Sequence, residues 1–320
     1  MPVSRAGKFI FIFCFLLGRN IAHARTGDPG IQVTFPGLQY TADSSISIPF
    51  SRAGNLILIR AKADTTEGNF ILDTGCPHLV LNLTYFRDYP LQTATEERGG
   101  ITGASFTVNQ TQIADFSLGG NSHYRISADV LNLGNIENSK GIKVLGLIGL
   151  QLLSKFEMII DYETYRIYLR KASKKEPPGN MHPLLADTST YHVVPITLTD
   201  NRIMVNTLIA GKKIRLIIDS GAETNLLDSR LPDKVFEQVS ITGRSTLMGA
   251  GNTKIDVLRG DLNSLTLGRQ VLEGLPVLIT NLEKTCFAYG GCVDGILGFD
   301  ILSLRRIGFN FVTNKMYIWR

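Results

Sequence analysis

The chain has 320 residues, of which 44% are hydrophobic and 19% charged, a composition typical of a globular protein rather than a disordered one. This length is enough for two domains that each bury a core of their own. The formal net charge is +5, but no basic run is interleaved with aromatic residues, which argues against nucleic acid as a partner.

Residues 1–24 have the pattern of a secretory signal peptide. Two basic residues precede the apolar run Phe9–Leu17, and the small-x-small sequence Ala-His-Ala ends at Ala24. The run is shorter than the roughly 20 residues that a membrane span requires, which favours cleavage after Ala24 over an uncleaved anchor. We therefore expect export to the periplasm or the exterior, no stable membrane span after processing, and an N-terminal extension over residues 25–44.

The rest of the chain is an internal duplication. The sequence Asp73-Thr-Gly75 recurs 146 residues later as Asp219-Ser-Gly221, and the same offset relates Gly103-Ala104 to Gly249-Ala250. Three extra residues in the second copy then raise the offset to 149, which relates Leu118 to Leu267. A shared frame over more than a hundred residues predicts two homologous units, at residues 45–170 and 191–320. The charged and Pro-rich segment 171–190 is the expected linker between them.

Each copy has the pattern of short β-strands. Apolar, β-branched segments bounded by polar residues or glycine predict strands, among them Leu56–Ala61, Asn69–Leu72, Arg215–Ile218, Thr164–Leu169 and Asn314–Trp319. The only good helix candidates are the pieces that follow the second glycine motif of each copy, Leu150–Phe156 and Phe299–Arg305. The predicted fold class is therefore all-β, with two lobes.

Asp73 and Asp219 are the candidate catalytic residues. Each lies between two apolar strands, where desolvation disfavours its charge, whereas a simple turn needs no acid there twice. Two such carboxyls can share one proton, because adjacent like charges do not both ionise readily. One carboxylate then takes a proton from the attacking water while the other carboxyl protonates the carbonyl oxygen of a peptide bond. This chemistry needs no metal or cofactor.

These motifs resemble those of the retropepsin-like and pepsin-like aspartic peptidases over nearly the whole mature chain. The resemblance rests on Phe-Ile-Leu-Asp73-Thr-Gly, Leu-Ile-Ile-Asp219-Ser-Gly-Ala, Gly146–Gly149 and Asp294–Gly298. It implies a closed β-barrel-like lobe for each copy, with an active-site cleft between the lobes.

The resemblance also implies roles for the residues around the two acids. In the family, the hydroxyl groups of the motif interlock between the lobes, and by position these are the hydroxyls of Thr74 and Ser220. Gly75 and Gly221 let the backbone approach the carboxyls closely. Glycine-rich flap hairpins are expected near Gly99–Phe106 and Gly243–Ile255, with the flap residues Gly103, Ala104, Gly249, Ala250 and Gly251. A single chain then suffices as a monomeric pseudo-dimer acting on peptide or protein substrates.

The chain departs from the family after each catalytic glycine. Pepsin-like enzymes place Ser or Thr there, whereas this chain has Cys76 and Ala222. A hydroxyl that donates to a carboxylate lowers the pKa of that carboxylate, so its absence lets the pKa rise. We therefore expect activity to extend toward near-neutral pH.

Three cysteines remain after the expected cleavage. Cys286 and Cys292 enclose a five-residue loop and are the expected disulfide pair, although sequence alone does not fix the connectivity. Cys76 is then a free, buried thiol. The five histidines are scattered and no Cys/His spacing indicates a metal site.

Other interpretations of the same residues remain open. The chain could be a catalytically inactive, peptide-binding protein on the same scaffold, since fold does not fix function. A metal- or Ser/His-dependent hydrolase finds no supporting motif. Asp294 has Leu145 as its counterpart, which indicates a turn residue, and the counterpart of His78 is Thr224, which argues against a shared catalytic role.

Overall fold

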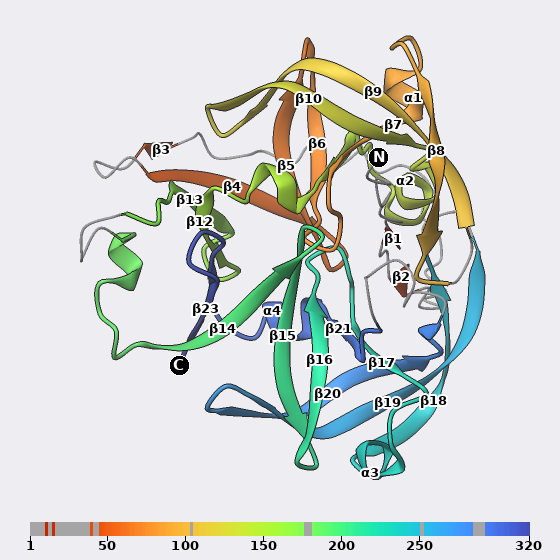
Figure 1. Cartoon of the computed structure of the whole chain (residues 1–320), viewed down its shortest axis with the longest axis vertical. Coiled ribbons are helices and arrows are strands. Elements are labelled where there is room, and N and C mark those ends of the chain that lie inside the picture. Colours follow the sequence, from red (N-terminus) through yellow and green to blue (C-terminus); the bar gives the residue numbers. More distant parts are fainter. Residues whose placement is uncertain are drawn as a thin grey trace, which may run out of the picture.

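The computed structural model describes residues 45–102, 105–175, 181–249, 253–283 and 292–320, together with three short strands near the N-terminus. Side chains are described in these ranges except over residues 93–100 and 105–107. Figure 1 shows the strands of the first half of the chain in the upper part of the molecule and those of the second half in the lower part.

Six strands of the first half form a closed ring, in the order β5–β6–β11–β7–β10–β9 and back to β5. Two more strands add to this ring without being part of it. Strand β4 pairs with β5, and strand β8 pairs with β9. The bounds are β4 Ser45–Ala53, β5 Leu56–Ala63, β6 Thr66–Leu72, β7 Leu79–Asn82, β8 Gln92–Gly100, β9 Ser105–Leu118, β10 Asn121–Leu131 and β11 Gly146–Ile148.

The second half repeats this arrangement strand for strand. Its ring runs β15–β16–β21–β17–β20–β19 and closes on β15, with β14 and β18 added at the corresponding places. The predicted barrel-like lobes are therefore confirmed. The bounds are β14 Tyr191–Thr199, β15 Arg202–Ile209, β16 Lys212–Ile218, β17 Asn225–Asp228, β18 Val239–Met248, β19 Lys254–Leu267, β20 Gln270–Thr280 and β21 Gly295–Leu297.

A third sheet, which the sequence did not predict, joins the two halves. Its order is β3–β4–β13–β12–β22–β23–β14, so that β12 of the first half pairs with β22 of the second. Both β4 and β14 run from this sheet into a ring, and Figure 1 shows the sheet on the left of the molecule. The bounds are β3 Gln39–Tyr40, β12 Phe156–Asp161, β13 Arg166–Lys171, β22 Ile307–Asn310 and β23 Lys315–Trp319.

Short helices are more numerous than the sequence predicted. The two expected pieces are present but shorter than expected, as η1 Leu150–Leu152 and α4 Phe299–Leu302. The prediction that no other segment is a good helix candidate was wrong, because helices of one or two turns carry too few residues for a 3.6-residue period to be visible. The additional helices are α1 Leu83–Phe86, α2 Gly134–Lys140, η2 Pro183–Leu185 and α3 Asp233–Phe236.

The first 44 residues contribute two further strands, β1 Ile10–Phe11 and β2 Phe15–Leu16. Strand β1 pairs with β8 and β2 pairs with β18. The rest of the predicted signal peptide lies outside the described residues. None of the helices in the described part of the chain is long and apolar enough to cross a bilayer.

Candidate active site

Asp73 and Asp219 occupy equivalent places at the ends of β6 and β16. The backbone N–H of Asp73 donates to the carbonyl oxygen of Ile148 at 3.0 Å, and that of Asp219 donates to Leu297 at 2.9 Å. These acceptors end β11 and β21, which are the hydrophobic-hydrophobic pieces of the two glycine motifs. Each acid is therefore held by a strand of its own half, and both acids are fully buried.

The hydroxyl groups of Thr74 and Ser220 lock the two loops together. The backbone N–H of Thr74 donates to Ser220 Oγ, and the backbone N–H of Ser220 donates to Thr74 Oγ1, both at 3.0 Å. Each hydroxyl in turn donates across the boundary, Thr74 to the carbonyl of Ile218 and Ser220 to the carbonyl of Leu72. Four reciprocal hydrogen bonds thus fix the distance between the two halves at the acids.

Gly75 and Gly221 each lie beneath the carboxyl group of the other half. A Cβ on Gly75 would overlap the carboxyl of Asp219, and a Cβ on Gly221 would lie 2.6 Å from Cγ of Asp73. The backbone N–H of Gly75 donates to both acids, to Asp73 Oδ1 at 3.0 Å and to Asp219 Oδ1 at 3.2 Å. Glycine is required at both positions because a side chain would push the two carboxyls apart.

Burial and proximity both favour the protonated form of the pair. The pKa of Asp73 is raised well above its usual value, first by burial and then by the neighbouring Asp219 carboxyl. The pKa of Asp219 is also raised by burial, and backbone N–H groups oppose this shift. The Oδ2 atoms of both acids have no hydrogen-bond partner among the described residues. Two buried carboxyls with raised pKa values can share a proton and hold a water molecule between them.

Comparison with known proteins agrees with this geometry. Residues 205–301, which include Asp219-Ser-Gly221, match a family model described as aspartyl protease. The aspartic proteinase from Irpex lacteus superposes with a TM-score of 0.52 at 15% identity, covering 86% of this chain and 97% of that one. The chain has the pepsin/retropepsin-like aspartic protease fold.

Two further solved structures superpose on the chain. The structure of edgp superposes with a TM-score of 0.50 at 10% identity, covering 87% of this chain and 95% of that one. Basic 7S globulin from soybean gives a TM-score of 0.47 at 10% identity, with 86% and 94% covered. No curated protein matches the sequence. At these identities the likeness concerns the fold alone.

Within this aspartic protease fold, a buried polar cluster that sequence reasoning missed joins the halves beside Asp219. Glu223 is 4% exposed and pairs with Lys140 Nζ at 2.5 Å. The backbone N–H of Asn55 donates to Glu223 Oε2 at 3.1 Å, and the Asn55 side chain donates to the Glu223 carbonyl at 2.9 Å. The one signal in the sequence was an acid two residues after Gly221.

Arg202 is a second residue that sequence reasoning missed. It is a fully buried arginine at the start of β15, and its charge lowers the pKa of Asp219, opposing the effect of burial. Its counterpart in the first copy, 146 residues earlier, is Leu56. The positive charge therefore favours ionisation on the side of Asp219, which makes the two acids electrostatically unequal.

The remaining predicted residues near the acids have structural contacts. Asp294 directly precedes β21, and its Oδ2 accepts from the backbone N–H of Arg215 on β16 at 2.7 Å. The Nδ1 atom of His78 lies 3.1 Å from Gln151 Oε1. Cys76 is a free, buried cysteine whose thiol donates to the carbonyl of His78, while its backbone N–H donates to Asp73 Oδ1. Burial raises the pKa of the Cys76 thiol well above its usual value.

The hairpins β8–β9 and β18–β19 occupy the places predicted for the flaps. Of the five predicted flap residues, Gly103, Ala104, Ala250 and Gly251 lie outside the described residues. Gly249 is described, and a Cβ on it would lie 2.9 Å from Ile101 Cγ2, so the two hairpins touch. Ile101 packs into an apolar cluster of the second half, and Met248 packs into one of the first half. Each hairpin therefore reaches across to the opposite half.

Of the expected disulfide pair, Cys292 is disulfide-bonded and Cys286 lies outside the described residues. Among the described residues, no group of three or more His, Cys, Asp or Glu side chains is placed to hold a metal ion.

Proposed function

We propose that this chain is an aspartic endopeptidase in which Asp73 and Asp219 act as one catalytic pair. The observation that carries the proposal is the reciprocal packing of the two loops, in which each carboxyl lies over the glycine of the opposite half. This packing holds two buried acids together where they share one proton. The ionised carboxyl takes a proton from water as the water attacks the peptide carbonyl, and the protonated carboxyl donates to the carbonyl oxygen.

The flap hairpins meet each other across the two halves. Residues near the hairpin tips pack into the opposite halves, and Gly249 lies against Ile101. Opening of this contact would separate the hairpins and give a peptide a way to the buried acids. Such closing segments commonly exclude water from the reaction and release product by reopening.

The burial of Asp73 and Asp219 also favours a second candidate function, that of an inactive protein that binds peptides on this scaffold. If the hairpins stay closed over the acids, peptides are held outside the pair and no bond is broken. Turnover of peptides by the wild-type protein distinguishes the two candidates.

The decisive experiment incubates the purified protein with a diverse peptide library beside Asp73→Asn and Asp219→Asn. Each substitution removes one titrating group and keeps the shape of the side chain, so cleavage should fall by at least about 10²–10⁴-fold. Asp294→Asn is the matched control and should retain activity, because its side-chain oxygen still accepts from Arg215. Peptide binding without cleavage by the wild type would support the binding protein. Near-native turnover by either pair variant would contradict the assignment of the two acids.

We also propose that the protein acts outside the cytoplasm as a monomer. The disulfide at Cys292 supports an oxidising compartment, as the predicted signal peptide does. Both half-sites are present in one chain, which supports action without a second copy. Activity per mole should stay constant across a dilution series.

A further inference from the structure

Arg202 lies across two paired strands from Asp219. In the antiparallel pair β15–β16, Ile203 is opposite Ile218, so the next residues outward, Arg202 and Asp219, are opposite each other. Residues that are opposite in an antiparallel pair have their side chains on the same side of the sheet. The arginine is therefore held beside the acid by the pairing of two barrel strands.

The side of the sheet that carries Arg202 and Asp219 is turned toward the first half. Side chains alternate along a strand, so Arg202 shares its side with Met204, and Asp219 shares its side with Ile217. Met204 and Ile217 pack in one apolar cluster with Ile101 of the first half. Arg202 is fully buried there, so its charge acts on the acids with little screening by solvent.

The first half has no charge at the equivalent place. Its strands β5 and β6 pair with Leu58 opposite Ile71, which brings Leu56 opposite Asp73. Leu56 is the residue 146 positions before Arg202, and it is also fully buried. The barrel therefore accepts an apolar side chain at this position, and its formation does not by itself require the arginine.

The backbone hydrogen bonds do not distinguish the two acids, since among the described residues each carboxyl accepts two N–H groups. Asp73 Oδ1 accepts from Gly75 and Cys76, each at 3.0 Å. Asp219 Oδ1 accepts from Gly221 at 2.8 Å and from Gly75 at 3.2 Å. These donors favour the ionised form of either acid to a similar degree.

A negative charge on the side of the first acid acts in the same sense as the arginine. Asp129 of β10 is 1% exposed, and it is among the groups that raise the pKa of the Cys76 thiol, after burial and Asp73. Arg202 lowers that pKa. Negative charge beside Asp73 disfavours its ionisation, whereas positive charge beside the other acid favours ionisation there.

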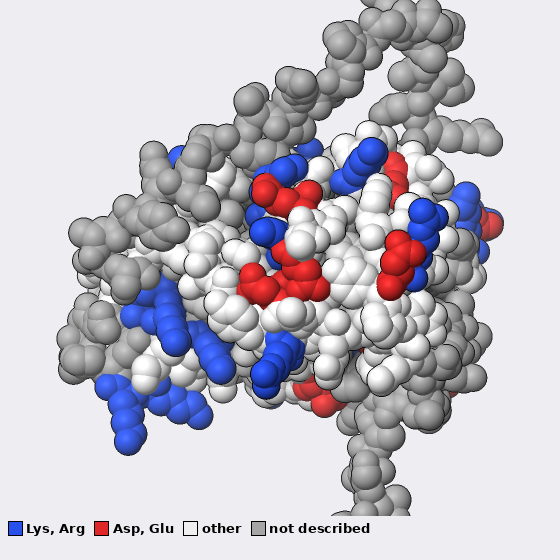
Figure 2. Space-filling model, turned by 90° about the horizontal axis from the view of Figure 1, so that it is seen from above, with Lys and Arg blue, Asp and Glu red and all other residues white. Residues whose placement is uncertain are grey.

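Other charged groups around the pair are neutralised or screened by solvent. Glu223 is paired with Lys140, and together they carry no net charge. Asp200, in the turn before β15, is exposed. Figure 2 shows further Lys, Arg, Asp and Glu side chains beside one another near the centre of the face shown. Charges in contact with water act on buried groups far more weakly than a buried charge does.

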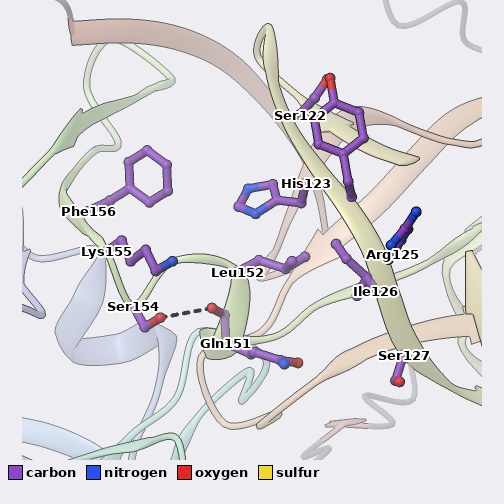
Figure 3. Close-up of a pocket in the computed structure, with 11 residues that line it drawn as sticks. Ser122, His123, Arg125, Ile126, Ser127, Gln151, Leu152, Ser154, Lys155 and Phe156 are labelled. Carbon is purple, nitrogen blue, oxygen red and sulfur yellow. Dashed lines mark hydrogen bonds between the residues drawn. The ribbon is translucent and has the colours of Figure 1, made fainter. Parts of the chain in front are cut away.

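The basic side chains around the pocket between β10 and the segment that leads from η1 into β12 are also screened. Figure 3 shows His123 and Lys155 facing each other across this pocket and Arg125 on the other side of β10. Arg125 and Lys155 are exposed, and no residue of the two aspartate loops lines the pocket. The buried charge opposite Asp219 is therefore the one that separates the two acids.

We propose that Arg202 is a positioning residue that fixes the roles of the two acids, with Asp219 as the ionised carboxyl and Asp73 as the protonated one. The inference rests on the proposed peptidase function and adds to it which acid holds the proton. Water then gives a proton to Asp219 as its oxygen bonds to the peptide carbonyl carbon, and Asp73 gives its proton to the carbonyl oxygen. Burial raises the pKa of both acids, and Arg202 opposes this rise at Asp219.

The pH dependence of kcat/KM tests the role of the charge. Arg202→Leu introduces the residue of the first half and should move the acidic limb to higher pH by about one unit, because ionisation at Asp219 forms the active pair. The alkaline limb should move less, since it reports the second ionisation, at Asp73. Arg202→Lys keeps the charge and should keep the acidic limb in place, as should Lys213→Gln on the exposed hairpin β15–β16. Equal loss of activity at every pH, without movement of the acidic limb, would show a purely structural role and overturn the proposal.

A second measurement needs no peptidase activity and stays decisive if Arg202→Leu does not fold. Carbon-13 NMR of the wild-type protein, labelled at its aspartate carboxyls, follows both acids through a pH titration, and Asp73→Asn and Asp219→Asn assign the two signals. Asp219 should reach the chemical shift of a carboxylate at a pH where Asp73 is still protonated. Ionisation of Asp73 first, or of both acids together, would overturn the proposal even if peptides are cleaved. The expected order without any cleavage would support it and contradict only the peptidase function.

Discussion

The two aspartate loops, Asp73–His78 and Asp219–Thr224, share their backbone contacts. In both, the N–H of the acid donates to the last residue of the strand from the glycine motif. In both, the carbonyl of the fourth residue accepts from the helix that follows that motif: Leu150 N–H donates to Cys76 and Phe299 N–H donates to Ala222, each at 2.9 Å. The hydroxyls of Thr74 and Ser220 are likewise reciprocal.

The side chains beyond these contacts differ between the two loops. Glu223 reaches into the first half, whereas its counterpart Pro77 has no side chain that can do so. Thr224 Oγ1 donates to Asp300 Oδ2 at 2.6 Å, where the first loop has His78 beside Gln151. The duplication has thus kept the parts that hold the acids and allowed their surroundings to diverge, which is the difference that the following experiments test.

The largest effect is expected at the two glycines, where the loops are most alike. Gly75→Ala and Gly221→Ala should each reduce kcat/KM by at least about 10²-fold, because a Cβ displaces the opposite carboxyl and small displacements of reacting groups are costly. Overpacking should also lower the free energy of unfolding by about 1–3 kcal/mol. Gly141→Ala meets no atom within 4 Å, so it should leave kcat/KM unchanged, although its φ of +66° should lower the free energy of unfolding by about 1–2 kcal/mol. A large loss in only one of the two loop variants would show that the loops are not equivalent.

The next effect concerns the contact that only the second loop makes. Glu223→Gln leaves Lys140 without its carboxylate, and breaking one partner of a buried pair costs about 3–5 kcal/mol. The double variant Glu223→Gln/Lys140→Met should lose less than the sum of the single losses when unfolding is followed in urea. The exposed pair Arg60–Glu67 is the control, with an expected coupling of at most about 1 kcal/mol. Simple additivity at Glu223 and Lys140 would contradict a direct link between the halves.

A third test uses the pKa shifts of the two acids. A carboxyl whose pKa is raised in the folded state contributes stability that is complete below its unfolded pKa and is lost as pH rises through its folded pKa. Burial and Asp219 raise the pKa of Asp73 well above its usual value, so the Tm of Asp73→Asn relative to wild type should increase from pH 4 to pH 7.5. Hydrogen bonds from Ser189 lower the pKa of Asp187, so Asp187→Asn should not show this increase. Thermal unfolding of the wild type and the two variants, followed by circular dichroism at pH 4 and pH 7.5, measures how each difference in Tm changes with pH.

The smallest effect is expected at the matched turn positions 125 and 274. Arg125→Gly should raise the free energy of unfolding by less than about 1 kcal/mol, because glycine relieves the left-handed backbone. Gly274→Ala should lower it by about 1–2 kcal/mol for the same reason, since a Cβ there meets no other atom. If both substitutions raised, or both lowered, the free energy of unfolding, the turn would not be equivalent in the two halves.

The sequence predicted those parts of the molecule that depend on local pattern or on the repeat. The strands before Asp73 and Asp219 follow from motifs that occur twice, and the two rings agree with what the resemblance of these motifs implies. The pairing of β12 with β22 was not predictable, because it joins segments about 150 residues apart without a sequence signal. The contact of Glu223 with Asn55 and Lys140 was not predictable either. All three are polar residues without a motif, and only the folded chain shows that they meet.

The sheet that joins the halves has a consequence for how the chain folds. Strand β12 can complete its pairing only after β22, near the end of the chain, has been synthesised. At the same place Glu157 is 2% exposed. Its Oε1 bonds Arg170 Nε at 3.1 Å within the first half, but its Oε2 accepts from Asn310 Nδ2 at 3.0 Å, a partner that only β22 supplies. Contacts this distant in sequence slow folding and leave an open strand edge in the meantime. A fragment ending before β22 should therefore aggregate rather than persist as an independent half, and the intact protein should gain its native structure late in a single cooperative step.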